Sequence, residues 1–148
     1  MNSNLPKGLI SPEEARELNQ EFIKTRSKEL NKIVERISKK PKKKDALSSW
    51  FSLEELKKYI AYVEEEGTKK GKKISGLRVY FGAYSKKETD LKKQNLSTVF
   101  FVPTELKVGS LQKDGITGDE GIADINDIDG LNNGSTGHPP AAEYPQEQ

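Results

Sequence analysis

The chain has 148 residues, about the length of one domain. Only 32% of these residues are hydrophobic and 32% are charged, against about 45 to 50% apolar residues in an ordinary globular domain, so we expect part of the chain not to fold. Cysteine is absent, which excludes disulfide bonds, thiolate metal sites and thiol catalysis. The sequence contains neither a signal-peptide pattern nor an apolar run of roughly 18 residues, so we expect a cytoplasmic protein without a membrane partner.

The charges are divided unevenly along the chain. Residues 1–108 contain 24 Lys and Arg against 15 Asp and Glu, a net charge of +9, whereas residues 109–148 contain one lysine against eight acidic residues, a net charge of −7. A basic body attracts anionic partners, and a tethered acidic segment competes for the same surface. Such charges also solvate helix faces without any other role, and this interpretation stays open.

A helix start follows a flexible lead-in over residues 1–10. In Ser11-Pro12-Glu13-Glu14 the serine is an N-cap, proline takes the first helical position, and Glu14 reaches back to the cap. Pro41 should end this helix near Ser38, because proline removes a backbone donor and disfavours helical geometry in the residue before it. The helix has one apolar stripe, which we expect to be buried. The stripe consists of Ala15, Leu18, Phe22, Ile23, Leu30, Ile33, Val34 and Ile37.

A basic linker over residues 39–45 follows the first helix. Five of its residues are lysines, namely Lys39, Lys40, Lys42, Lys43 and Lys44. Three interpretations stay open: a solvated linker, a surface that contacts nucleic-acid phosphates, and a nuclear-localisation signal.

A second helix start lies at Ser52, which is an N-cap with Glu55 at the third helical position. Either Gly67 or Gly71 should supply the left-handed residue that ends this helix. Gly67 also falls on the apolar stripe of the helix, where it would permit another part of the backbone to approach closely.

From Gly76 onward the apolar residues alternate, as in a strand. One face carries Leu77, Val79, Phe81 and Ala83, and the other carries Arg78, Tyr80, Gly82 and Tyr84. A second strand is predicted over Leu96 to Val102, with Pro103 at its end. Because a two-stranded hairpin is marginally stable alone, we expect a third strand from Glu105 to Leu111 or from a second subunit.

These elements predict an α+β fold in which two helices pack on a small antiparallel sheet, in the order α-α-β-β, as a single domain over residues 11–108. Residues 109–148 are acidic and rich in glycine and proline, which is typical of a disordered tail. Within this tail, Asp124 to Gly130 has some acidic residues of a calcium-binding loop. It lacks the first ligand and the bidentate glutamate, so we predict no metal site.

No catalytic constellation is present in the sequence. A nucleophile needs an adjacent base, and the single histidine, His138, lies between glycine and two prolines in the predicted tail. Neither a phosphate-binding loop nor a dinucleotide fingerprint occurs. We therefore expect no enzyme and no cofactor.

Three segments carry a resemblance to other proteins, namely Trp50 to Leu56, Gly76 to Tyr84 and Thr98 to Thr104. Together they resemble a group of small uncharacterised bacterial proteins that share a capped helix followed by a hairpin ending in a Phe-Val-Pro turn. The likeness covers about residues 46–108. It implies a bacterial cytoplasmic origin and brings no activity.

Two functions fit these observations. The first is a non-catalytic binding protein that engages itself, as a homodimer, or another protein through the stripe of the first helix or the aromatic face of the hairpin, with Arg78, Tyr80 and Tyr84 as candidate residues. The second is salt-dependent, sequence-unspecific nucleic-acid binding by the five lysines of the linker, modulated by the acidic tail.

Overall fold

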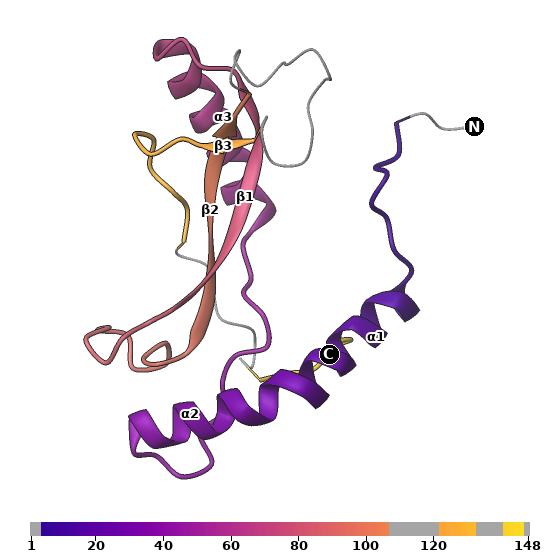
Figure 1. Ribbon diagram of the computed structural model, residues 1–148, viewed down its shortest axis with the longest axis vertical. Helices are drawn as coiled ribbons and strands as arrows, with labels where there is room; N and C mark the ends of the chain where they lie inside the picture. Colours follow the sequence, from indigo (N-terminus) through magenta and orange to yellow (C-terminus); the bar gives the residue numbers. More distant parts are fainter. Residues whose placement is uncertain (1–3, 107–121, 133–140, 147–148) are drawn as a thin grey trace. The chain divides into compact units, whose positions relative to one another are not determined.

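A computed structural model describes residues 4–106, 122–132 and 141–146 (Figure 1). Their contacts divide the chain into two compact units. Unit 1 contains residues 4–48, 84–96 and 141–146, and unit 2 contains residues 49–83, 97–106 and 122–132. The loop of the hairpin thus belongs to the unit of the first helix, while its strands belong to the unit of the second. The single domain expected over residues 11–108 stays a prediction.

The first helix is continuous and has three parts, α1 (Pro12–Phe22), the π-helical turn η1 (Ile23–Ser27) and α2 (Lys28–Ser38). The predicted capping box is confirmed: Glu14 N donates to Ser11 Oγ at 3.1 Å, and Ser11 N donates to Glu14 Oε2 at 2.7 Å. The helix ends after Ser38, as predicted, at Lys39 with a left-handed φ of 57°.

The apolar stripe of this helix is only partly buried. Val34 forms the core of unit 1 with Ala46 and Leu96, whereas Leu18 and Ile37 are exposed. A π-helical turn accommodates an extra residue, so η1 rotates the residues that follow it relative to those that precede it. The prediction of one continuous buried stripe is wrong, because stripe residues on both sides of η1 are exposed and Val34 is the one stripe residue that is buried among the described residues.

Unit 2 contains one helix and one sheet. The helix is α3 (Leu53–Lys69), and the antiparallel sheet has the order β1 (Ile74–Ala83), β2 (Ser97–Glu105), β3 (Ala123–Asp124). Glu55 N donates to Ser52 Oγ at 3.0 Å, which confirms the predicted cap. Gly71, with a φ of 67°, supplies the left-handed residue after α3. The predicted α+β class is confirmed, with α3 as the helix that packs on the sheet.

Pro103 lies inside β2 and does not end it as predicted. It pairs with Leu77 of β1, while its carbonyl oxygen accepts a hydrogen bond from Ile125 N at 3.0 Å on the other side. In an antiparallel strand the N–H and C=O groups of one residue point to the same side. The missing N–H of Pro103 therefore faces away from β1, and the pairing of β1 with β2 loses nothing.

The third strand of the described sheet comes from the predicted tail. Of the segment 105–111 that was expected to supply it, Glu105 ends β2, and residues 107–111 lie outside the described residues. Ile125 and Ile128 are buried against Tyr59 and Val63 of α3, with Ile125 only 2% exposed. Tyr59 donates its hydroxyl to Asp129 O at 2.9 Å, and burial raises the pKa of Tyr59 to about 12. The expected disorder is thus wrong for residues 122–132, because their spaced isoleucines complete a core.

The rest of the tail divides into two parts. Residues 141–146 belong to unit 1, where Tyr144 N donates to Asn19 Oδ1 at 2.9 Å. Residues 109–121, 133–140 and 147–148 lie outside the described residues, so the expected disorder there stays a prediction.

Replacing Ile125 by alanine should lower the free energy of unfolding of unit 2 by about 2 to 5 kcal/mol, because the substitution leaves a cavity in the core. This loss is measured by urea unfolding, with hydrogen exchange of the strand amides as the signal that reports on unit 2. Ile122→Ala, at a position 41% exposed in the same segment, is the matched control and should cost less than about 1 kcal/mol. Equal effects of the two variants would contradict the docking of this segment.

Candidate interaction surfaces

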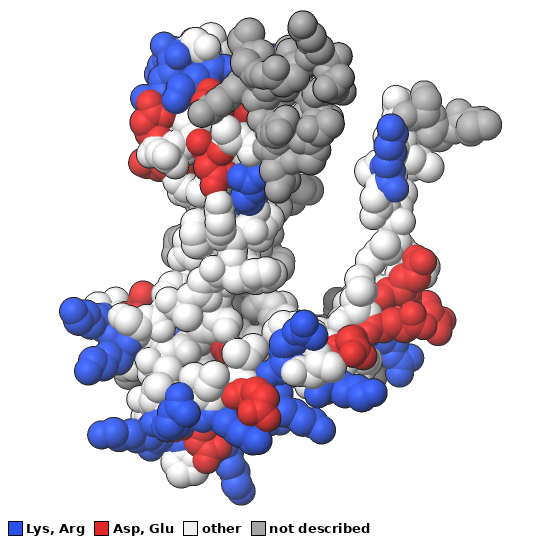
Figure 2. Space-filling view, viewed as in Figure 1, with Lys and Arg blue, Asp and Glu red and all other residues white. Residues whose placement is uncertain are grey.

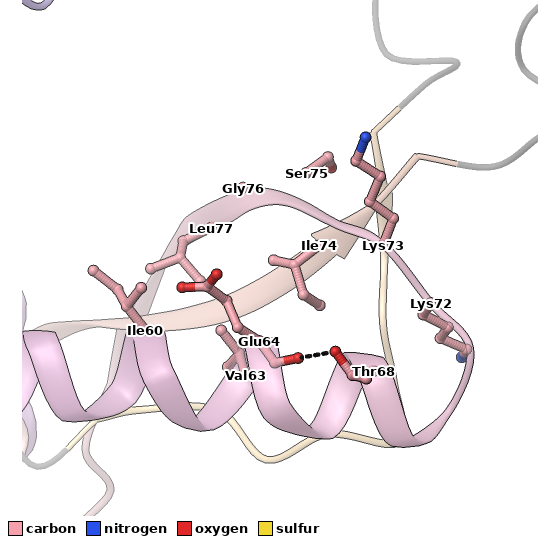
Figure 3. A pocket seen from close by; sticks show the side chains of 10 residues that line it. All are labelled: Ile60, Val63, Glu64, Thr68, Lys72, Lys73, Ile74, Ser75, Gly76 and Leu77. Atoms are coloured by element: carbon pink, nitrogen blue, oxygen red, sulfur yellow. Dashed lines mark hydrogen bonds between the residues drawn. The ribbon is translucent and has the colours of Figure 1, made fainter.

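An open groove of about 500 Å³ lies between α3 and β1 (Figure 3). Ile60 and Val63 of α3 and Ile74 and Leu77 of β1 contribute its apolar side chains. The polar residues of the lining are Glu64, Thr68, Lys72, Lys73 and Ser75. An apolar groove beside a strand is the arrangement that accepts an additional strand in many peptide-binding domains.

The outer edge of β1 is unpaired in the part of the chain that the structure describes, because the sheet ends with this strand. Tyr84 N donates to Leu96 O at 3.0 Å, so the peptide groups of Tyr84 point toward the second arm of the hairpin. Alternate residues of a strand point to the same side, and the peptide groups of Leu77, Val79 and Phe81 therefore point outward from the sheet. These groups are available for hydrogen bonds with another strand.

The side chains along this edge are apolar and become more exposed with distance from α3. Leu77 packs on the core beneath α3, whereas Val79 is 49% exposed and Phe81 is 91% exposed. Phe81 is the most exposed of the large hydrophobic residues in the described ranges. An unpaired, apolar edge strand is an unusual feature, because proteins normally protect such edges with charges, proline or a bulge.

The predicted partner-binding residues lie on the opposite face of the hairpin. Arg78 and Tyr80 both bond to Asp124 of β3, and the ring of Tyr80 stacks on Phe100 with centroids 5.4 Å apart. The hydrogen bond to Asp124, followed by desolvation, raises the pKa of Tyr80. Arg78 and Tyr80 thus have partners within the chain that hold β3 in place.

Tyr84, the third candidate, belongs to unit 1, where the ammonium of Lys93 lies 5.7 Å from the centre of its ring. The structure therefore brings Arg78 and Tyr80 together on Asp124 and assigns Tyr84 to unit 1. The exposed residues that the sequence interpretation missed are Val79 and Phe81. The alternation along β1 identified their shared face, but gave no sign that α3 covers only part of it.

Acidic residues of the tail pair with basic residues of unit 2. Asp127 lies 3.2 Å from Lys72 Nζ and 3.6 Å from Lys70 Nζ, and the hydrogen bond from Lys72 is the largest influence that lowers the pKa of Asp127. Asp124 pairs with Arg78. In residues 122–132 the acidic tail thus neutralises cations of unit 2, and its predicted effect on the lysine linker stays untested.

The lysine linker lies in unit 1 beside the hairpin loop. Lys43 Nζ donates to Gln94 O at 3.3 Å across 51 residues of sequence. Desolvation and the nearby charge of Lys40 lower the pKa of Lys43. The loop adds lysines that the linker pattern did not include, namely Lys86, Lys87, Lys92 and Lys93. Figure 2 shows Lys and Arg gathered over α2 and its surroundings.

The described residues contain no group of three or more His, Asp or Glu side chains that could hold a metal ion. Within the same ranges, no helix has both the length and the apolar character needed to span a membrane. His138 lies outside the described residues.

Comparisons of the chain with protein-family models, with curated proteins and with solved structures each found no match. The resemblance to small bacterial proteins therefore stays a prediction, and the function has to be argued from the surfaces themselves.

Gly67 is a buried residue near the C-terminal end of α3 that lies against the chain leading into β1. A Cβ at this position would lie 2.8 Å from Ile74 Cδ1 and 2.9 Å from the backbone oxygen of Lys72. Gly67→Ala should therefore destabilise unit 2 by about 1 to 3 kcal/mol, although alanine in a helix normally stabilises by about 1 kcal/mol relative to glycine. Urea unfolding measures the sign of this change.

Ala61→Gly, at an exposed position of the same helix, is the control and should cost about 1 kcal/mol through helix propensity alone. A stabilising Gly67→Ala substitution would show that α3 and β1 are not in close contact.

Proposed function

We propose that the protein is a non-catalytic binding protein that associates with a second copy of itself by pairing β1 with β1. The observation that carries this proposal is the unpaired edge of β1 together with Phe81, which is 91% exposed. Burying a phenylalanine side chain contributes roughly 1.5 to 3 kcal/mol, so leaving Phe81 in water forgoes a substantial stabilisation that a second strand would supply. The stripe of the first helix is a weaker candidate, since its Val34 is already buried in the core of unit 1.

The sequence of β1 is complementary to itself in one antiparallel register, centred on Tyr80. In this register Val79 faces Phe81 of the second copy, and Phe81 faces Val79 in return. Both residues have outward-pointing peptide groups, so they form a hydrogen-bonded pair, and their side chains meet on one face. Arg78 lies opposite Gly82, so that no like charges face each other.

This pairing joins two three-stranded sheets into one sheet of six strands with the two-fold symmetry typical of homodimers. Each copy would contribute Val79 and Phe81 to an apolar cluster at the two-fold axis. Hydrogen bonds between the strands would provide affinity, and the self-complementary register would provide specificity.

Phe81→Lys should weaken self-association strongly, because a lysine at this position would lie in the apolar cluster and protect the edge of the strand. Sedimentation velocity from about 1 μM to about 1 mM should show a concentration-dependent dimer for the wild type, and a dimer at least tenfold weaker for the variant. The matched control is Leu53→Lys, which makes the same charge change at a residue 68% exposed on α3. A wild-type protein that stays monomeric over this range, or equal dimerisation of Phe81→Lys, would overturn the proposal.

The register has its own test, since the natural sequence contains no cysteine. Tyr80 would face Tyr80 of the second copy as a non-hydrogen-bonded pair, with Cα atoms about 4.5 Å apart, which is within the range of a disulfide bond. Tyr80→Cys should therefore form a covalent dimer under mild oxidation. Gly82→Cys is the control on the same face. Position 82 would face Arg78 of the second copy, four residues away from the second cysteine, so this variant should not cross-link. Cross-linking that is equally fast in both variants would contradict the register.

A further inference from the structure

Two lysine-rich segments that are distant in sequence lie together in unit 1. Leu96, at the end of the hairpin loop, is buried with Val34 of α2 and with Ala46, which follows the linker. Lys43 of the linker donates to Gln94 O in the loop at 3.3 Å. The small apolar core therefore holds the linker and the loop against α2 within unit 1. The lysines of all three segments contribute to one surface.

This part of unit 1 has a strong positive charge. Residues 24–45 and 84–96 contain 14 Lys and Arg against 5 Asp and Glu, a net charge of +9. Lys32 pairs with Glu29 at 3.1 Å, and both side chains are exposed. Over the two ranges together the cations outnumber the carboxylates by nine. Cations crowded in this way repel one another, and an anionic ligand relieves the repulsion.

The cations also have a regular geometry. Lys28, Lys32 and Arg36 recur every four residues of α2, which separates them by about 6 Å along the helix axis. An open groove of about 420 Å³ continues this row and is lined by Lys32, Glu35, Arg36, Lys39 and Pro41. Successive phosphates of one DNA strand advance about 3.4 Å along the duplex axis and lie farther apart through space, because the strand winds around that axis, so the spacing of the row is comparable to the distance between neighbouring phosphates.

We infer that the surface formed by α2, the linker 39–44 and the hairpin loop binds the phosphodiester backbone of nucleic acid. A row of cations that leads into a groove suits a linear polyanion better than the plane of lipid headgroups. Lysines that contact phosphates read no base edges, so binding depends steeply on salt and little on sequence. This lysine surface goes beyond the proposed self-association, which uses unit 2.

The test uses the full chain and three variants with the same change in charge. They are the linker variant K39Q/K40Q/K42Q, the loop variant K86Q/K87Q/K92Q and the control K57Q/K58Q/K73Q in unit 2. Fluorescence anisotropy with a labelled single-stranded RNA and a DNA duplex of about 20 nucleotides, between about 50 and 200 mM salt, gives the affinity and its salt slope. Vesicles of phosphatidylcholine and phosphatidylserine serve as the competing anionic surface.

The linker and loop variants should each weaken binding at low salt by at least tenfold and reduce the salt slope by about 2 to 3, because each lost phosphate contact lowers the slope by about 0.9. The control should change affinity less than about threefold.

A loop variant that binds like the wild type would overturn the two-segment surface. Affinity independent of salt, or binding to vesicles and not to nucleic acid, would overturn the ligand class. Unchanged circular dichroism of the variants excludes misfolding, and Phe81→Lys, which tests self-association, should bind the same oligonucleotides.

Discussion

The burial of Ile125 and Ile128 against α3 is the interaction on which unit 2 depends. One helix and a two-stranded hairpin leave much of their apolar surface in contact with water, and Tyr59 and Val63 need a cover. The segment 122–132 provides this cover and places β3 beside β2. Acidic side chains between its isoleucines bond to Lys70, Lys72 and Arg78, so that charge and burial act together in docking the segment.

The docked segment also decides which surfaces of the sheet are available. It occupies the outer edge of β2, and Asp124 engages Arg78 and Tyr80 on one face. The edge of β1 and the apolar side chains of Val79 and Phe81 are among the surfaces that this arrangement leaves exposed within the described chain. The same contacts that complete the core would therefore direct the proposed self-association toward the edge of β1.

Unit 1 combines a very small core with a high charge. Val34, Ala46 and Leu96 are buried together, while many lysines surround them. Repulsion between these lysines opposes the assembly of the unit, and burial of the three apolar side chains favours it. A bound polyanion would remove the repulsion and leave the burial, so the inferred ligand and the stability of unit 1 are linked.

Local features were predictable from the sequence, because their partners lie within a few residues. The caps at Ser11 and Ser52 and the left-handed Gly71 depend on hydrogen bonds and backbone angles inside one turn of helix. The alternation along β1 likewise identified which side chains share a face.

Tertiary structure decided the place of Pro103, the docking of Ile125 and the exposure of Phe81. Each depends on segments distant in sequence. Pro103 fits inside β2 because its nitrogen faces β3, Ile125 is buried because it covers α3, and Phe81 is exposed because no described segment covers it. Short-range periodicity determines which side chains can be buried together. Which of them are buried depends on long-range packing, since the free energy of burial comes from whatever surface arrives to exclude water.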